Sequence, residues 1–125
     1  MTTPAEVVAR RRRERGALLE LARQLADNLD PALGVRGVVV FGSAARGDFN
    51  AASDVDVLVV ADHLPDRPLD RLRALGRYPP RVEAVAWTPP EWEAQLARRN
   101  PIAVEARQCG IWLVGGFDLA NPSGD

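Results

Sequence analysis

Two carboxylates, Asp54 and Asp56, stand one residue apart at the start of an apolar run, and a Gly42-Ser43 turn precedes them. If that run is a strand, both carboxylates point to the same face, with Cα atoms about 6.5 Å apart. Carboxylate oxygens are the ligands that ions of the magnesium type prefer, and the backbone N–H groups of a Gly-Ser turn can bind phosphate. The combination predicts nucleotide chemistry on a divalent metal.

A third acid, Glu83, interrupts the otherwise apolar segment 82–87. We expect it to face the same groove as the two aspartates if their strands are adjacent. Two carboxylates about 4 Å apart repel by about 4 kcal/mol at an effective dielectric constant near 20, so such crowding favours a bound cation or a shared proton. The alternative interpretation, in which Asp54 caps a turn and Asp56 is simply exposed, leaves the nearby turn and Glu83 unexplained.

The turn carries further candidate ligand contacts. Gly42 lets the backbone approach a ligand closely, and Ser43 adds a hydroxyl group. Arg46 can either neutralise a triphosphate or pair with Asp48, and the sequence leaves both interpretations open.

Positioning these groups requires a scaffold of strands and helices. Apolar, β-branched runs predict buried strands at 35–41, 55–60, 82–87 and 111–114. Helices are predicted at 4–29, 69–75, 88–99 and 101–108, with a short one opening at 44–46. Thr3 with Glu6, and Thr88 with Glu91, have the spacing of capping boxes at two of the helix starts.

Length and composition predict one domain over residues 1–118 and a disordered tail over 119–125. The formal charge is −1, so bulk charge does not predict binding to nucleic acid or membrane. All 16 basic residues are arginines, which excludes a catalytic lysine or a P-loop lysine. We expect a cytoplasmic protein because there is no signal peptide and no apolar run near 18 residues. Cys109, with apolar neighbours, is expected to be a buried structural thiol.

Several other residues have two interpretations. The arginines at 10–13 and 15 form either a solvated helix face or a surface for RNA or an acidic partner. His63 is expected in an exposed loop. Trp87, Trp92 and Trp112 are expected to pack in the core or an interface rather than stack on a base.

The segment from Phe41 to Gly47, followed by Ser53-Asp54-Val55-Asp56 and a hydrophobic strand, resembles the signature of the DNA-polymerase-beta-like nucleotidyltransferase superfamily. It is most similar to the small minimal nucleotidyltransferases of bacteria and archaea. The resemblance spans roughly residues 35–115 and includes the Thr-Pro-Pro-Glu segment that begins at Thr88.

The resemblance implies an α/β fold in which helices flank a short mixed sheet. It implies transfer of a nucleoside monophosphate, AMP from ATP, with Mg²⁺ or Mn²⁺ as cofactor. Carried over to this sequence, the metal ligands and catalytic residues are Asp54, Asp56 and Glu83. The residues for the nucleotide are Gly42, Ser43, Arg46 and Ser53.

This chain departs from the family pattern at two points. Many relatives have aspartate where Glu83 stands, and larger members have an extra helical domain that helps to form the acceptor pocket. The resemblance therefore suggests that a second subunit or a HEPN-type helical partner from a toxin–antitoxin pair completes the cleft, with a tyrosine of that partner as acceptor. The alternative is a non-catalytic, antitoxin-like binding module of the same fold.

Overall fold

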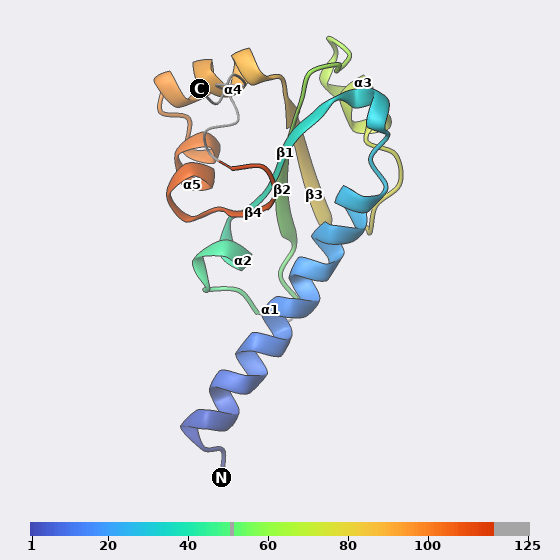
Figure 1. The fold of residues 1–125 in the computed structure, drawn as a ribbon. Coiled ribbons are helices and arrows are strands. Elements are labelled where there is room, and N and C mark those ends of the chain that lie inside the picture. Colours follow the sequence, from blue (N-terminus) through green and yellow to red (C-terminus); the bar gives the residue numbers. More distant parts are fainter. Residues whose placement is uncertain (51, 117–125) are drawn as a thin grey trace.

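A four-stranded mixed sheet forms the centre of the molecule, in the spatial order β3-β2-β1-β4. The computed structural model describes residues 1–50 and 52–116. Its elements, in chain order, are α1 (Pro4–Asp27), the 3-10 turn η1 (Pro31–Leu33), β1 (Val35–Phe41), α2 (Ser43–Arg46), β2 (Val55–Ala61), α3 (Pro68–Ala74), β3 (Val82–Trp87), α4 (Pro89–Ala97), α5 (Pro101–Cys109) and β4 (Ile111–Val114) (Figure 1). The predicted α/β class is confirmed.

Strand pairing brings the predicted acidic residues together. β1 lies antiparallel to both β2 and β4, while β2 and β3 run parallel. A parallel pair needs a crossover connection, and α3 with its flanking loops provides it. The sequence-based expectation that the strand of Glu83 lies next to the strand of the aspartates is confirmed.

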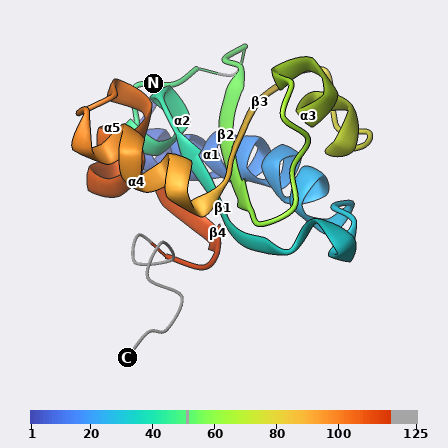
Figure 2. The same cartoon turned by 90° about the horizontal axis from the view of Figure 1, so that it is seen from above.

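Helices cover both faces of the sheet, which explains why the central strands are apolar without alternation. On one face, Leu18, Ala22 and Leu25 of α1 pack in a cluster with the inward side chains Val38 and Val57. On the other face, α4 and α5 contribute Trp92, Ala103 and Ala106 to a second cluster with the next residues along the same strands. Figure 2 shows α1 and the α4–α5 pair on opposite sides of the sheet.

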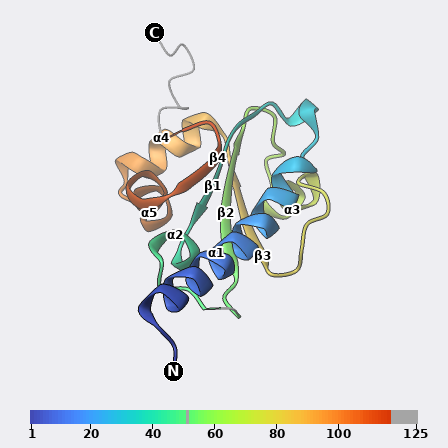
Figure 3. The ribbon, with the colours of Figure 1, turned by 60° about the horizontal axis from the view of Figure 1, so that its bottom comes forward.

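The predicted capping boxes form at both helix starts. The Oγ1 atom of Thr3 accepts from the backbone N–H of Glu6 at 3.1 Å, and the Glu6 carboxylate accepts from the backbone N–H of Thr3 at 3.3 Å. Thr88 and Glu91 exchange the same two bonds at the start of α4. α1 ends two residues before the predicted boundary, and the N-terminal turns of α1 extend beyond the sheet (Figures 1 and 3).

The three tryptophans pack against one another, in agreement with the sequence-based expectation. Trp92 is fully buried, and its ring centroid lies 6.5 Å from that of Trp87 and 5.8 Å from that of Trp112. The second contact is edge-to-face, a geometry that the ring quadrupoles favour.

The expectation for Cys109 is wrong, because its side chain is exposed. Its apolar neighbours Ile111 and Trp112 belong to β4, and Gly110 separates that strand from the helix that ends at Cys109. The predicted tail at 119–125 lies outside the described residues. Across residues 1–50 and 52–116, the structure has no helix that is both long and apolar enough to cross a membrane.

Candidate active site

Asp56 and Glu83 occupy register positions opposite each other on the parallel strands β2 and β3. Residues in register on neighbouring strands point to the same face, and Glu83 is close enough for its charge to act on the carboxyl group of Asp56. Both lie on the face that α4 and α5 cover, because Phe41, the register partner of Asp56 on β1, belongs to that core cluster. The structure therefore unites two of the three predicted acids.

Burial is the main reason that Asp56 holds its proton unusually tightly. Desolvation, followed by the charge and hydrogen bond of Glu83, raises the pKa of Asp56 to about 6. The negative charges of Asp54 and Glu105 raise it further. Two neighbouring carboxyl groups repel each other when both are ionised, so a proton or a cation between them is favourable.

Asp54 lies one residue before β2 and is exposed, but it is close enough for its charge to act on Asp56. Over the described parts of the chain, 1–50 and 52–116, no three acidic, histidine or cysteine side chains are grouped closely enough to form a complete metal site. The oxygen-only donor set of Asp54, Asp56 and Glu83 nevertheless fits a hard divalent cation, which would relieve the crowding of their charges.

The Gly42-Ser43 turn touches the acidic pair directly. Gly42 has φ +72° and ψ −155°, a conformation that is essentially restricted to glycine. A Cβ atom at Gly42 would overlap Oδ2 of Asp56 and lie 3.1 Å from its Cγ. Only glycine therefore allows the end of β1 and the Asp56 carboxylate to lie this close together.

Backbone donors lie at this turn. The carbonyl oxygen of Gly42 accepts from the N–H groups of Ala45 and Arg46 at 3.1 and 3.0 Å, which closes the single turn of α2. The N–H groups of Ser43 and Ala44, at the start of that turn, have no partner within the helix, as at any helix start. They are the backbone groups here that an anionic ligand can use.

Arg46 is engaged by two carboxylates. Its Nη1 atom forms an ion pair with Glu105 of α5, and its Nε atom lies 3.4 Å from Oδ2 of Asp48. The pairing with Asp48, one of the two interpretations that the sequence leaves open, is present, and the pairing with Glu105 is additional. Ser53 lies in the loop before β2, where its Oγ accepts from the backbone N–H of Asn50 at 2.8 Å.

Two arginines of α1 hold the loop around α2, a role that the sequence did not reveal. Arg11 donates through Nη1 to the carbonyl oxygen of Phe49 and through Nη2 to that of Gly47, both at 2.7 Å. The guanidinium carbon of Arg11 also lies 3.9 Å from the centre of the Phe49 ring. Arg15 donates to two carbonyl oxygens of α2, those of Ala44 and Ala45.

For Arg11 and Arg15, these contacts add a structural role that neither interpretation of the arginine run included. Arg12 and Arg13 are exposed, as a solvated face requires, but Arg11 and Arg15 are partly buried and have structural partners. Their spacing of four residues places both on one side of the helix. That spacing is a signal in the sequence, although the neighbouring arginines obscure it.

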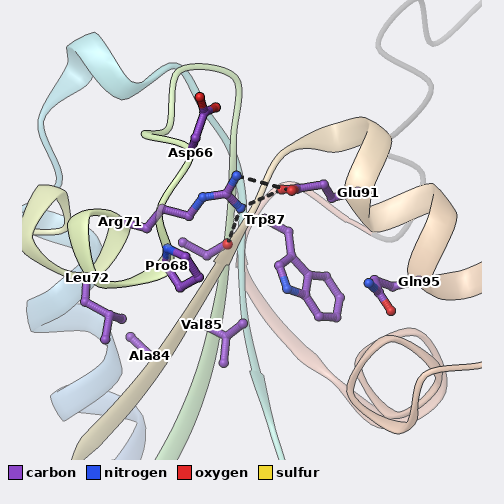
Figure 4. Close-up of a pocket in the computed structure, with 10 residues that line it drawn as sticks. Asp66, Pro68, Arg71, Leu72, Ala84, Val85, Trp87, Glu91 and Gln95 are labelled. Carbon is purple, nitrogen blue, oxygen red and sulfur yellow. Dashed lines mark hydrogen bonds and ion pairs between the residues drawn. The ribbon is translucent and has the colours of Figure 1, made fainter.

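His63 lies far along the sheet from the acids, just past the opposite end of β2, and is exposed as expected. A pocket of about 390 Å³ lies between α3, β3 and α4, near Arg71, Trp87 and Glu91 (Figure 4). None of the residues that line this pocket was predicted to bind nucleotide or metal.

Acidic side chains that meet beside a glycine-dependent turn form an arrangement suited to transfer of a phosphate-containing group. The chain belongs to the nucleotidyltransferase domain family, whose model matches residues 19–106.

Two comparisons agree with this family. The chain is 50% identical over 38 residues to a protein of Methanocaldococcus jannaschii that is named provisionally as a protein adenylyltransferase. That match covers 30% of this chain and only 26% of the relative. The fold is similar to the crystal structure of a provisionally assigned nucleotidyltransferase from Sulfolobus solfataricus, with a TM-score of 0.60 and 21% identity over 82% of this chain and 84% of that one.

Proposed function

We propose that the protein transfers AMP from ATP to a hydroxyl acceptor. The observation that carries the proposal is the contact between Gly42 and Asp56, which lies in register with Glu83 on the neighbouring strand. This contact supports the proposal because the proposed phosphate donors and the proposed cation ligands lie beside each other. Membership of the nucleotidyltransferase family supports the same reaction class.

The residues divide into two groups in this proposal. Gly42 and Ser43 form the turn that holds the triphosphate, with the backbone N–H groups of Ser43 and Ala44 as donors, and Ser53 is a further predicted nucleotide contact. Arg46, which is exposed beside the turn, turns from its carboxylate partners to the triphosphate. Mg²⁺ or Mn²⁺ is held by the carboxylates of Asp54, Asp56 and Glu83. Bound there, the ion neutralises charge on the phosphates and on the leaving pyrophosphate.

The transfer forms one bond and breaks another. The acceptor oxygen attacks the α-phosphorus, the bond between the α-phosphorus and its bridging oxygen breaks, and pyrophosphate leaves. The hydroxyl proton passes to the Asp56–Glu83 pair.

For the acceptor, we propose a tyrosine of a partner protein of the HEPN type. The similarity to a protein named provisionally as a protein adenylyltransferase supports a protein acceptor. Two of the three acidic residues, Asp54 and Glu83, are exposed, which supports access by a macromolecule.

A second candidate is a non-catalytic binding module of the same fold. It is favoured by the absence, among residues 1–50 and 52–116, of a complete three-residue metal cluster, and by the engagement of Arg46 with Glu105. This candidate predicts association with a partner that survives substitution of both aspartates.

Incubation of this protein with labelled ATP, Mg²⁺ and the protein encoded beside it distinguishes the transferase from the non-catalytic binding module. The transferase proposal predicts labelled AMP on the partner and release of pyrophosphate, both abolished by Asp54→Ala or Asp56→Ala. If folded variants keep full activity, the metal assignment is wrong. Binding without any transfer would favour the second candidate.

A further inference from the structure

We propose that the outer edge of β3 binds an extended peptide segment of a protein acceptor, with the modified hydroxyl beside Glu83. This inference rests on the proposed function and adds the form in which the acceptor is recognised. It follows from the strand order, the backbone groups of β3 and the groove beside them.

The strand order sets the direction from which an acceptor must come. The turn proposed to bind phosphate follows β1, Asp56 lies on the central strand β2, and Glu83 lies on β3, which forms one edge of the sheet. Displacement at phosphorus is in line, so the attacking oxygen and the leaving pyrophosphate lie on opposite sides of the α-phosphorus. With the triphosphate tail on the β1 side, the hydroxyl enters from the β3 side.

The edge of β3 has backbone groups that can pair with a peptide. The carbonyl oxygen of Arg81 accepts from the N–H of Val55 in β2. The backbone N–H and C=O groups of residue 81, and of every second residue after it, therefore point toward β2. The backbone N–H and C=O groups of the alternate residues Val82, Ala84 and Ala86 therefore point away from β2, toward the outer edge of the sheet. The N–H of Val82 donates to Pro79, and the carbonyl oxygen of Ala86 accepts from Arg71.

Ala84 lies between these two occupied positions, and its N–H and C=O groups point outward from the sheet. Ala84 is half-buried, whereas Val82 and Ala86 are buried. A strand edge with free backbone groups is a template for pairing with another chain. Peptide-recognition domains use this mode of binding, in which main-chain hydrogen bonds give affinity and side-chain pockets give specificity.

The pocket of about 390 Å³ runs along this edge. Figure 4 shows Arg71 and Glu91 bridged over β3, with Ala84 and Leu72 at the other end of the lining. Arg71 also donates to the carbonyl oxygen of Ala86 at 3.1 Å. The bridge consists of ion pairs in which Arg71 Nη1 lies 2.6 Å from Glu91 Oε1. The bridge therefore limits the groove near the end of β3, and the chain order leads from Ala84 directly to Glu83.

The lining specifies the chemistry of the peptide. Val85 and Leu72 are apolar, and Leu72 is 37% exposed although its helix packs on the sheet. Of the charged side chains in the lining, Arg71 and Glu91 neutralise each other, which leaves the negative charge of Asp66. The fitting segment has an apolar side chain toward Val85 and a basic side chain toward Asp66.

The test uses two kinds of acceptor with ATP and Mg²⁺. One is N-acetyl-tyrosinamide, which reports on the chemistry alone. The other is a pool of peptides with a fixed central tyrosine and randomised flanking residues, analysed by mass spectrometry. We expect the pool to be modified with a higher kcat/KM than the amide, with enrichment of apolar and basic flanking residues. N-methylation of the peptide backbone, which removes pairing but keeps the side chains, should abolish the advantage.

Variants locate the effect on the groove. Leu72→Asp should lower kcat/KM for the peptides about tenfold and leave the amide rate unchanged, because it affects docking and not chemistry. Ala84→Pro removes an outward N–H and should act in the same direction. Val7→Asp is the matched control, because Val7 of α1 is also 37% exposed and lies outside the groove.

The experiments give different results if the peptide-docking proposal is wrong than if the proposed AMP transfer is wrong. Transfer to the amide, with no advantage for the peptides and no effect of Leu72→Asp, would overturn the groove proposal alone. Fluorescence anisotropy of labelled pool peptides detects docking without turnover; docking that Leu72→Asp weakens, with no AMP transferred to any acceptor, would support the groove and overturn the proposed reaction. Self-association of the protein that Leu72→Asp abolishes would assign the edge to a second copy and overturn the peptide proposal.

Discussion

The carboxylate of Asp56 fills the space that a side chain at Gly42 would need. These residues come from different strands, with Gly42 directly after β1 and Asp56 at the second position of β2. Antiparallel pairing of Phe41 with Asp56 brings them together. The glycine of the motif is thus required both for its backbone conformation and for the carboxylate beside it.

Gly42→Ala should therefore disrupt the site. The new methyl group displaces Asp56 or the turn, and a displacement of about 1 Å can lower catalysis about 100-fold. The measurement is the rate of pyrophosphate release, together with thermal unfolding. Gly47→Ala is the matched control, because Gly47 also has positive φ (+98°) but a Cβ there meets nothing within 4 Å. Gly47→Ala should be destabilised by about 1–2 kcal/mol and remain active; equal activity losses in both variants would contradict a specific role for the Asp56 contact.

The two clamping arginines of α1 lead to a second prediction. Arg15→Ala removes the donors to the carbonyl oxygens of Ala44 and Ala45, so the free energy of unfolding should fall by about 1–3 kcal/mol. KM for ATP should rise because the turn is no longer held, and Arg15→Lys should restore only part of the loss. The control is Arg12→Ala at an exposed position of the same helix. Unchanged stability and KM in Arg15→Ala would show that the clamp is dispensable.

The pKa of Asp56 leads to a third prediction, for the metal-free protein. Folding raises this pKa from 3.8 to about 6, so the folded state favours protonated Asp56. Ionised Asp56 therefore lowers the free energy of unfolding, and this destabilisation grows as the pH rises from 3.8 through 6 and is largest above 6. Asp56→Asn should raise the unfolding temperature in the presence of a chelator, more at about pH 7.5 than at about pH 5. A gain independent of pH, or larger at the acidic pH, would contradict the shift.

Arg46 allows a test of its two interpretations. If it neutralises the triphosphate, Arg46→Ala should raise KM for ATP several-fold, whereas Glu105→Gln should not, because the latter releases the guanidinium from one partner. Steady-state kinetics at varied ATP concentration distinguish the two cases. Equal defects in both variants would indicate that the ion pair serves the fold rather than the nucleotide.

The sequence predicted the local structure well because each element carries its own signals. The strands β1, β3 and β4 have the predicted boundaries, since each is a short apolar run that ends at a turn or a cap. Thr3 and Thr88 form the predicted caps because capping depends on residues only three positions apart.

Contacts between distant segments were less predictable. The adjacency of Asp56 and Glu83 was a correct prediction, but it depended on assuming that their strands pair. The Arg11 and Arg15 contacts depend on where α1 crosses the sheet, and the partners are backbone carbonyls that every residue possesses. Nothing in the residue types of 44–49 identifies which carbonyls receive these bonds.

Direct titration of metal and nucleotide tests the central claim most sharply. Isothermal titration calorimetry with Mn²⁺, in the presence of ATP, compares the wild-type protein with Asp56→Asn and Glu83→Gln, and with His63→Ala as a control at the other end of β2. We predict that the wild-type protein and His63→Ala bind with equal affinity, and that both acid variants lose at least about tenfold. Wild-type affinity in both acid variants would contradict a metal site formed by the acidic pair.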